Sequence, residues 1–146
     1  MSLKDLLDEG RLEKRETSKQ EILDLLRLAA RGLDDARVEQ VSLDGRFNHA
    51  YDAALALAII PLRCAGYRTK GEGHHYAIFD VLPEIMGKEV RGMARFLQTC
   101  RKIRNLSTYS RSGVVTRGEV LELIAQTLEF EQMVRHWLRT NYPEYS

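Results

Sequence analysis

The chain has few of the residues that mark secreted or metal-binding proteins. Only two cysteines, Cys64 and Cys100, occur among its 146 residues, and each sits in an apolar helical pattern. Both fit buried, reduced thiols, because no two cysteines, and no cysteine with a histidine, have the spacing of a zinc site. We therefore expect no metal, no cofactor and a reducing cytoplasmic environment.

Long apolar runs and a targeting segment are also missing. The longest apolar run, residues 53–62, is broken by Pro61. It is shorter than the ~20 residues that a helix needs to cross a bilayer. The first residues lack the basic flank and apolar stretch of a signal peptide. We expect a cytoplasmic protein with no membrane contact.

Sustained alternation of apolar and polar residues, the pattern of a half-buried strand, is absent. Apolar residues recur instead with a helical period. The sequence predicts an all-α, up-and-down bundle of about five helices. We expect one bundle domain over residues 17–146, preceded by a charged segment, 1–16, that packs loosely. The expected helices cover about residues 18–43, 46–65, 74–86, 88–106 and 116–140.

Several local signals set the expected helix ends. Ser18 with Glu21, and Thr116 with Glu119, match the capping box that begins a helix. Asp44-Gly45 is typical of a turn and predicts the end of the first long helix. Residues 67–73 are polar and predict a loop.

The expected helix over residues 46–65 carries small or apolar residues on nearly every side. A helix of this kind is buried centrally, and its small side chains let neighbours approach closely. Pro61 should bend it. Gly32, in the preceding helix, should weaken that helix by about 1 kcal/mol relative to alanine.

Carboxylates are absent between Glu89 and Glu119, although the whole chain is nearly neutral, with 22 basic and 21 acidic residues. Exposed helix faces usually mix both signs, since i,i+4 ion pairs stabilise them. An anionic ligand would offset the repulsion here, and arginine suits phosphate because its planar fork binds two oxygens. The alternative is pairing with distant acids such as Asp34, Asp35 or Glu39. The basic residues in this segment are Arg91, Arg95, Arg101, Lys102, Arg104, Arg111 and Arg117.

Arg104 and two histidines are the strongest candidates within this pattern. Arg104 follows Cys100 by four residues, on the inward edge of an apolar stripe, where an unpaired guanidinium is costly to bury. His74 and His75 are adjacent at a helix start, so they point about 100° apart and cannot hold one ion from one side. Either they set the helix start, or one faces Arg104 and exchanges protons near neutral pH.

Three stretches together resemble the HEPN superfamily of small helical domains associated with nucleotides and RNA. Arg104-Asn105 lies near a helix end, and Tyr109 stands where the family motif usually has histidine. The small-residue helix from Phe47 to Arg68 and the helix start His74-His75-Tyr76-Ala77 also match. The resemblance covers about residues 18–140.

Active HEPN members are metal-independent ribonucleases whose dimers bring two motifs into one cleft. The resemblance implies that Arg104 holds or polarises a phosphate and that Asn105 positions a phosphate or ribose oxygen. Tyr109 departs from the motif, because a phenol with a pKa of about 10 is not a base near pH 7. It can still stack on a base or donate a hydrogen bond to phosphate.

We therefore expect a HEPN-like homodimer that binds nucleotide or RNA without cleaving it. It would act by itself or as half of a toxin–antitoxin or nucleotidyltransferase-associated pair. One alternative is a ribonuclease that uses Arg104 and Asn105 with His74 or His75. Another is a structural dimerisation bundle in which Asp52 or Asp80 pairs fully with Arg104. The expected ligand-binding residues are Arg101, Arg104, Asn105, Tyr109 and Arg111.

Overall fold

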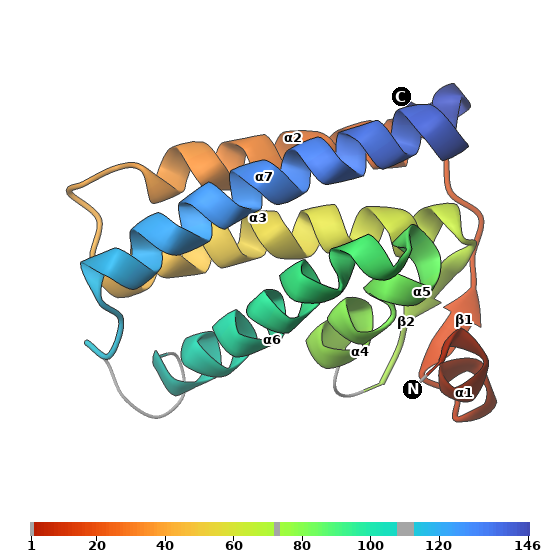
Figure 1. Ribbon diagram of the computed structural model, residues 1–146, viewed down its shortest axis with the longest axis horizontal. Helices are drawn as coiled ribbons and strands as arrows, with labels where there is room; N and C mark the ends of the chain where they lie inside the picture. Colours follow the sequence, from red (N-terminus) through yellow and green to blue (C-terminus); the bar gives the residue numbers. More distant parts are fainter. Residues whose placement is uncertain (1, 72–73, 108–112) are drawn as a thin grey trace.

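A computed structural model describes residues 2–71, 74–107 and 113–146 and confirms the all-α prediction (Figure 1). The 3-10 helices η1 (Lys88–Val90) and η3 (Pro143–Tyr145) adjoin the last two α-helices. None of the helices in these ranges is long and apolar enough to span a membrane. The α-helices are α1 (Leu3–Asp8), α2 (Lys19–Ala36), α3 (Leu43–Cys64), α4 (His74–Asp80), α5 (Leu82–Met86), α6 (Arg91–Asn105) and α7 (Arg117–Asn141).

Helix α3 is the centre of the bundle. It contacts α2 and α7 on one side, and α4, α5 and α6 on the other (Figure 1). Its buried residues come from all round the helix and include Ala50, Ala53 and Ala56 beside Phe47 and Tyr51. This confirms the central position that its small, apolar composition predicts.

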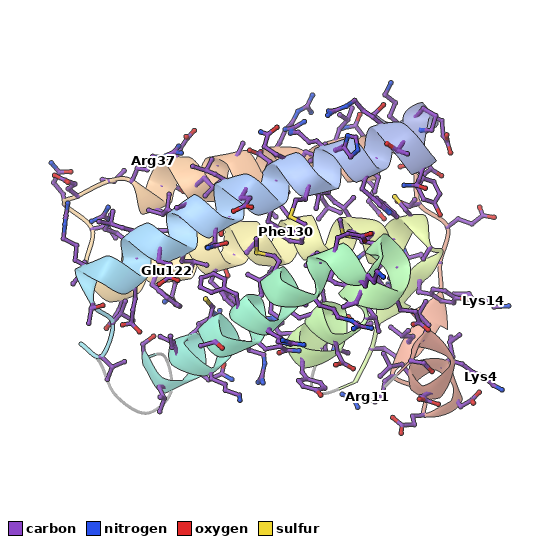
Figure 2. The ribbon with its side chains drawn as sticks, in the orientation of Figure 1. Lys4, Arg11, Lys14, Arg37, Glu122 and Phe130 are labelled. Carbon is purple, nitrogen blue, oxygen red and sulfur yellow. The ribbon has the colours of Figure 1, made fainter. Side chains whose placement is uncertain are left out.

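Helix α7 covers α3 with an apolar side and turns charged residues outward. Phe130 lies between α7 and α3 and is fully buried (Figure 2). Glu122 on α7 and Arg37 at the end of α2 lie on the outer surface (Figure 2). The labelled cations Lys4, Arg11 and Lys14 gather at the far end of the molecule, around α1 (Figure 2).

Two helix starts follow their capping signals. The Thr116 hydroxyl accepts from the Glu119 N–H at 3.1 Å, and the Glu119 carboxylate accepts from the Thr116 N–H at 2.9 Å. The Ser18 hydroxyl accepts from the Glu21 N–H at 3.1 Å. The Glu21 carboxylate, however, accepts from Arg63 at 2.7 Å and so ties the start of α2 to the end of α3.

The prediction of a turn at Asp44-Gly45 is wrong. Helix α2 ends at Ala36, and α3 already begins at Leu43. The reason is Ser42, whose hydroxyl accepts from the Gly45 N–H at 3.0 Å and caps the new helix. Asp44 and Gly45 therefore form its first turn.

The prolines have different effects. The expected helix over residues 74–86 is divided at Val81 into α4 and α5, with Pro83 in the first turn of α5. Because proline has no N–H to donate, it is tolerated at a helix start. Pro61 lies inside α3, which continues to Cys64.

The N-terminal segment packs firmly, against the expectation of loose packing. Leu6 is 0% exposed and Leu12 is 3% exposed. Strand β1 (Leu12–Lys14) pairs antiparallel with β2 (Tyr67–Thr69), inside the stretch expected to be a loop. Three-residue strands are too short to produce a recognisable alternation.

At Gly32, α2 and α3 approach each other closely. A Cβ atom there would lie 2.8 Å from the backbone oxygen of His49 and 3.1 Å from the Cβ of Ala53. The low helix propensity of glycine is therefore offset by packing.

We predict that Gly32→Ala lowers the free energy of unfolding by about 1–3 kcal/mol, because the added methyl overpacks a backbone contact. Gly92→Ala in α6 is the matched control, since a Cβ there meets nothing within 4 Å. That change should be neutral or stabilise by up to ~1 kcal/mol. Equilibrium urea unfolding of both variants measures the difference, and equal effects would contradict the packing role of Gly32.

Candidate anion-binding site

The site lies where the last turns of α6 meet α3 and α4, and Arg104 is at its centre. The guanidinium carbon of Arg104 is 5.1 Å from the centroid of the Tyr51 ring, a cation–π distance. Tyr51, on α3, is fully buried, and its ring meets Phe79 of α4 edge-on. The Arg104 side chain is only 21% exposed, in keeping with its spacing from Cys100.

The guanidinium of Arg104 is incompletely satisfied by the protein. Its Nε is buried and has no hydrogen-bond partner within the part of the chain that the structure describes. The Asp52 carboxylate is 3.9 Å from Nη2, too far for a hydrogen bond, and is 58% exposed, so water screens the pair. A buried N–H without a partner costs about 1–3 kcal/mol. An anion that meets Nε after a turn of the Arg104 side chain would remove that cost.

His75 completes the inner part of the site. Its Nδ1 lies 2.9 Å from the Tyr51 hydroxyl. Burial lowers the pKa of His75, and the positive charge of Arg104 lowers it further, so the ring is neutral at pH 7. Burial raises the pKa of Tyr51, which therefore keeps its proton.

The Tyr51 bond uses only one nitrogen of the His75 ring. If the Tyr51 hydroxyl donates to Nδ1, then Nε2 carries the proton and can donate to a ligand. If Nδ1–H donates to the hydroxyl oxygen, then Nε2 is an acceptor and can take a proton. Either tautomer leaves Nε2 outside this bond.

The two adjacent histidines have separate roles. His74 is exposed, and its Nδ1 lies 3.3 Å from the hydroxyl of Thr69, at the end of β2. It helps set the start of α4, as one of the two alternatives from the sequence predicts. His75 is the one that contacts the Tyr51 hydroxyl and lies near enough to Arg104 for its charge to act on the ring.

Arg101 forms a second cation–aromatic pair beside the first. Its guanidinium carbon lies 5.4 Å from the centroid of the Tyr76 ring. Its Nε donates to Gln98 Oε1 at 2.9 Å, and Gln98 Nε2 donates to the Tyr76 backbone oxygen at 3.0 Å. Arg101 and Arg104 are three residues apart, so they share one face of α6.

The remaining ligand candidates are placed as follows. Asn105 is the last residue of α6 and is half-buried beside Arg104 in the chain. Tyr109 and Arg111 lie outside the described residues, so their predicted roles stay predictions.

The basic residues of the acid-free segment do not form one cluster. Arg91 and Arg95, with Asp80, line a separate pocket of about 190 Å³. Arg117 pairs with Glu39 at 3.3 Å, as the alternative of distant pairing predicts. Among the arginines of this segment that the structure describes, Arg101 and Arg104 are therefore the ones that the fold brings to the aromatic and histidine side chains described above.

Tyr51 and Gln98 are site residues that the sequence does not single out. Tyr51 reads as one more member of the apolar stripe of α3. Its hydroxyl is the available signal, since a buried tyrosine needs a hydrogen-bond partner. Gln98 gives no signal, because its role depends on the approach of α4 to α6.

Comparisons of this chain with known protein families, with curated proteins and with solved structures find no match. The HEPN resemblance accordingly stays a prediction, and function is inferred from the geometry of the site.

We predict that Arg104→Gln raises the pKa of His75 toward its ordinary value of 6.5, because a nearby positive charge is removed while burial remains. Asp52→Asn should lower that pKa, since the carboxylate favours the protonated ring. NMR titration of the histidine ring protons measures both shifts. Arg135→Gln on α7, where Arg135 pairs with Glu131, is the control. An unmoved His75 curve in Arg104→Gln would contradict the coupling.

We also predict a stability loss in mild acid that depends on His75. The unfolded chain protonates His75 near pH 6.5, whereas the folded protein does so at lower pH. Between these two pKa values the unfolded state holds more protons, so the free energy of unfolding falls as the pH drops below about 6.5. Denaturant unfolding across pH should show a shallower fall for His75→Gln. An unchanged slope would show that other groups cause the loss.

Proposed function

We propose that this protein binds RNA or a nucleotide through phosphate contacts to Arg101 and Arg104. The observation that carries the proposal is the buried Nε of Arg104, which has no hydrogen-bond partner among the described residues. Nε is enclosed in the fold, so the Arg104 side chain must turn to bring it to the surface. A phosphate oxygen can then accept from Nε while a second oxygen accepts from a terminal nitrogen, the two-point contact for which a guanidinium is suited.

Pairing of Arg104 with a carboxylate of the protein itself is weak. A purely structural bundle would favour full pairing of Arg104 with an internal carboxylate such as Asp52. The 3.9 Å separation and the exposure of Asp52 leave the guanidinium with unused hydrogen-bonding capacity. Lys102, exposed on the same helix, adds positive charge without burial.

RNA cleavage is a second candidate, favoured by His75. Its neutral ring is hydrogen-bonded to the Tyr51 hydroxyl, and Arg104 lies over the Tyr51 ring. A phosphate held by Arg104 would therefore lie near a group that can accept a ribose hydroxyl proton. In this proposal His75 replaces the histidine that the HEPN motif usually has at the position of Tyr109. The reaction would need no metal.

The proposed assembly comes from the resemblance. A HEPN-like chain would act as a homodimer, and its partner would be a nucleotidyltransferase or an antitoxin. Neither partner is needed for the phosphate contacts described above.

We predict that the protein binds short single-stranded RNA with an affinity that falls as salt rises, since each neutralised phosphate contributes about −0.7 to the slope of log K against log salt. Arg104→Ala should weaken binding about 10- to 100-fold, as expected for loss of a charged hydrogen bond. Fluorescence anisotropy across a salt series measures both.

Arg135→Ala is the matched control, because Arg135 lies on α7 in an ion pair with Glu131. It should bind RNA as the unchanged protein does. Equal weakening in the two variants, or no binding at low salt, would count against the proposed site.

For catalysis, we predict that end-labelled RNA stays intact when incubated with the protein in chelator. Cleavage that disappears in both Arg104→Ala and His75→Ala would instead establish the second candidate. Cleavage that survives both substitutions would come from a contaminating nuclease.

A further inference from the structure

Tyr76 is an exposed aromatic ring held beside the proposed phosphate site. It follows His75 in α4 and is 40% exposed, whereas Tyr51 is fully buried. The guanidinium of Arg101 lies over one face of the ring, 5.4 Å from its centroid.

Helix α6 contacts Tyr76 both at its backbone and at one face of its ring. Gln98 donates to the backbone oxygen of Tyr76 at 3.0 Å and accepts from Arg101 at 2.9 Å. Arg101 in turn covers the ring. These contacts link α4 to α6 and hold ring and guanidinium in place before any ligand arrives, which lowers the entropy cost of binding.

The same pairing occurs twice, one helical turn apart. Arg104 covers Tyr51 on the inner side, and Arg101 covers Tyr76 on the outer side. Residues three apart on a helix have Cβ atoms about 5–6 Å from each other. The inner pair has the buried Nε without a partner, which suits phosphate. The outer pair has exposed aromatic surface, which suits a flat apolar group.

We infer that Tyr76 and Arg101 form a stacking platform for an unpaired base whose phosphate is held by Arg104. Bases stack on tyrosine rings and on guanidinium planes, and this is how proteins recognise single-stranded RNA. A duplex does not fit, because its base faces are covered by neighbouring pairs. The inference rests on the proposed function and names its ligand as single-stranded RNA.

The test compares three labelled probes with the unchanged protein. They are a short oligoadenylate, an abasic ribose-phosphate strand of the same length and charge, and the oligoadenylate paired with its complement. We expect the intact single strand to bind about 5- to 100-fold tighter than the abasic strand, as expected for stacking of one base. The duplex should bind no better than the abasic strand.

Variants separate stacking from a structural role of Tyr76. Tyr76→Ala should remove the preference for the intact strand and leave the affinity for the abasic strand unchanged, and Tyr76→Trp should keep the preference. Tyr145→Ala is the control, since Tyr145 in η3 is another partly exposed tyrosine and stacks on Tyr142. It should behave as the unchanged protein does.

Three results would contradict the stacking platform, and they differ in whether the proposed phosphate site also fails. Equal binding of intact and abasic strands, still weakened by Arg104→Ala, would leave the phosphate site standing without the platform. Equal weakening of both strands by Tyr76→Ala would assign the tyrosine to packing. No binding of any probe at low salt would remove the proposed function together with the platform.

Discussion

The contact between Arg104 and Tyr51 is the interaction on which the site depends. A guanidinium rests on a ring that is fully buried in the central helix, and its Nε has no hydrogen-bond partner within the described ranges. Cation–π attraction stabilises the charge in place of a carboxylate, because the ring faces it without forming hydrogen bonds. The Nε–H is therefore left unused by the described residues, and the same charge helps to keep His75 neutral. The proposed phosphate binding and the proposed proton transfer by His75 would both depend on this one placement.

The fold makes this placement possible through the small side chains of α3. Alanines in α3 let the surrounding helices approach, and the missing side chain at Gly32 leaves room for α3 beside α2. This arrangement could be predicted in outline, because the central helix is apolar on nearly every side and Thr116 with Glu119 caps α7. The helix boundaries near residue 43 could not, since Ser42 competes with the turn signal of Asp44-Gly45 for the same backbone. The strand pair β1–β2 was also beyond prediction, because it joins segments more than fifty residues apart by short backbone pairing.

The candidate site was predictable only where one helix determines it. The spacing of Arg104 from Cys100 placed its guanidinium at the inward edge of α6, and its exposure of 21% agrees. The partners on other helices depend on how α3, α4 and α6 meet, which no local pattern encodes. Thus Tyr51 resembled an ordinary core residue, Gln98 an ordinary surface residue, and His74 and His75 could not be told apart. The absence of acids along the segment predicted either a ligand or distant ion pairs for its arginines, and the fold supplies one such distant pair, Arg117 with Glu39.

We propose that the side chains around Arg104 position its guanidinium to bind an anion. The most direct measurement follows the arginine Nε–H signals by nitrogen-15 NMR while a nucleoside 3′,5′-bisphosphate is added. We expect the Arg104 signal to shift saturably, and at lower ligand concentration than that of Arg135, whose guanidinium pairs with Glu131. An Arg104 signal that stays in place, or one that moves only in step with every exposed arginine, would contradict it.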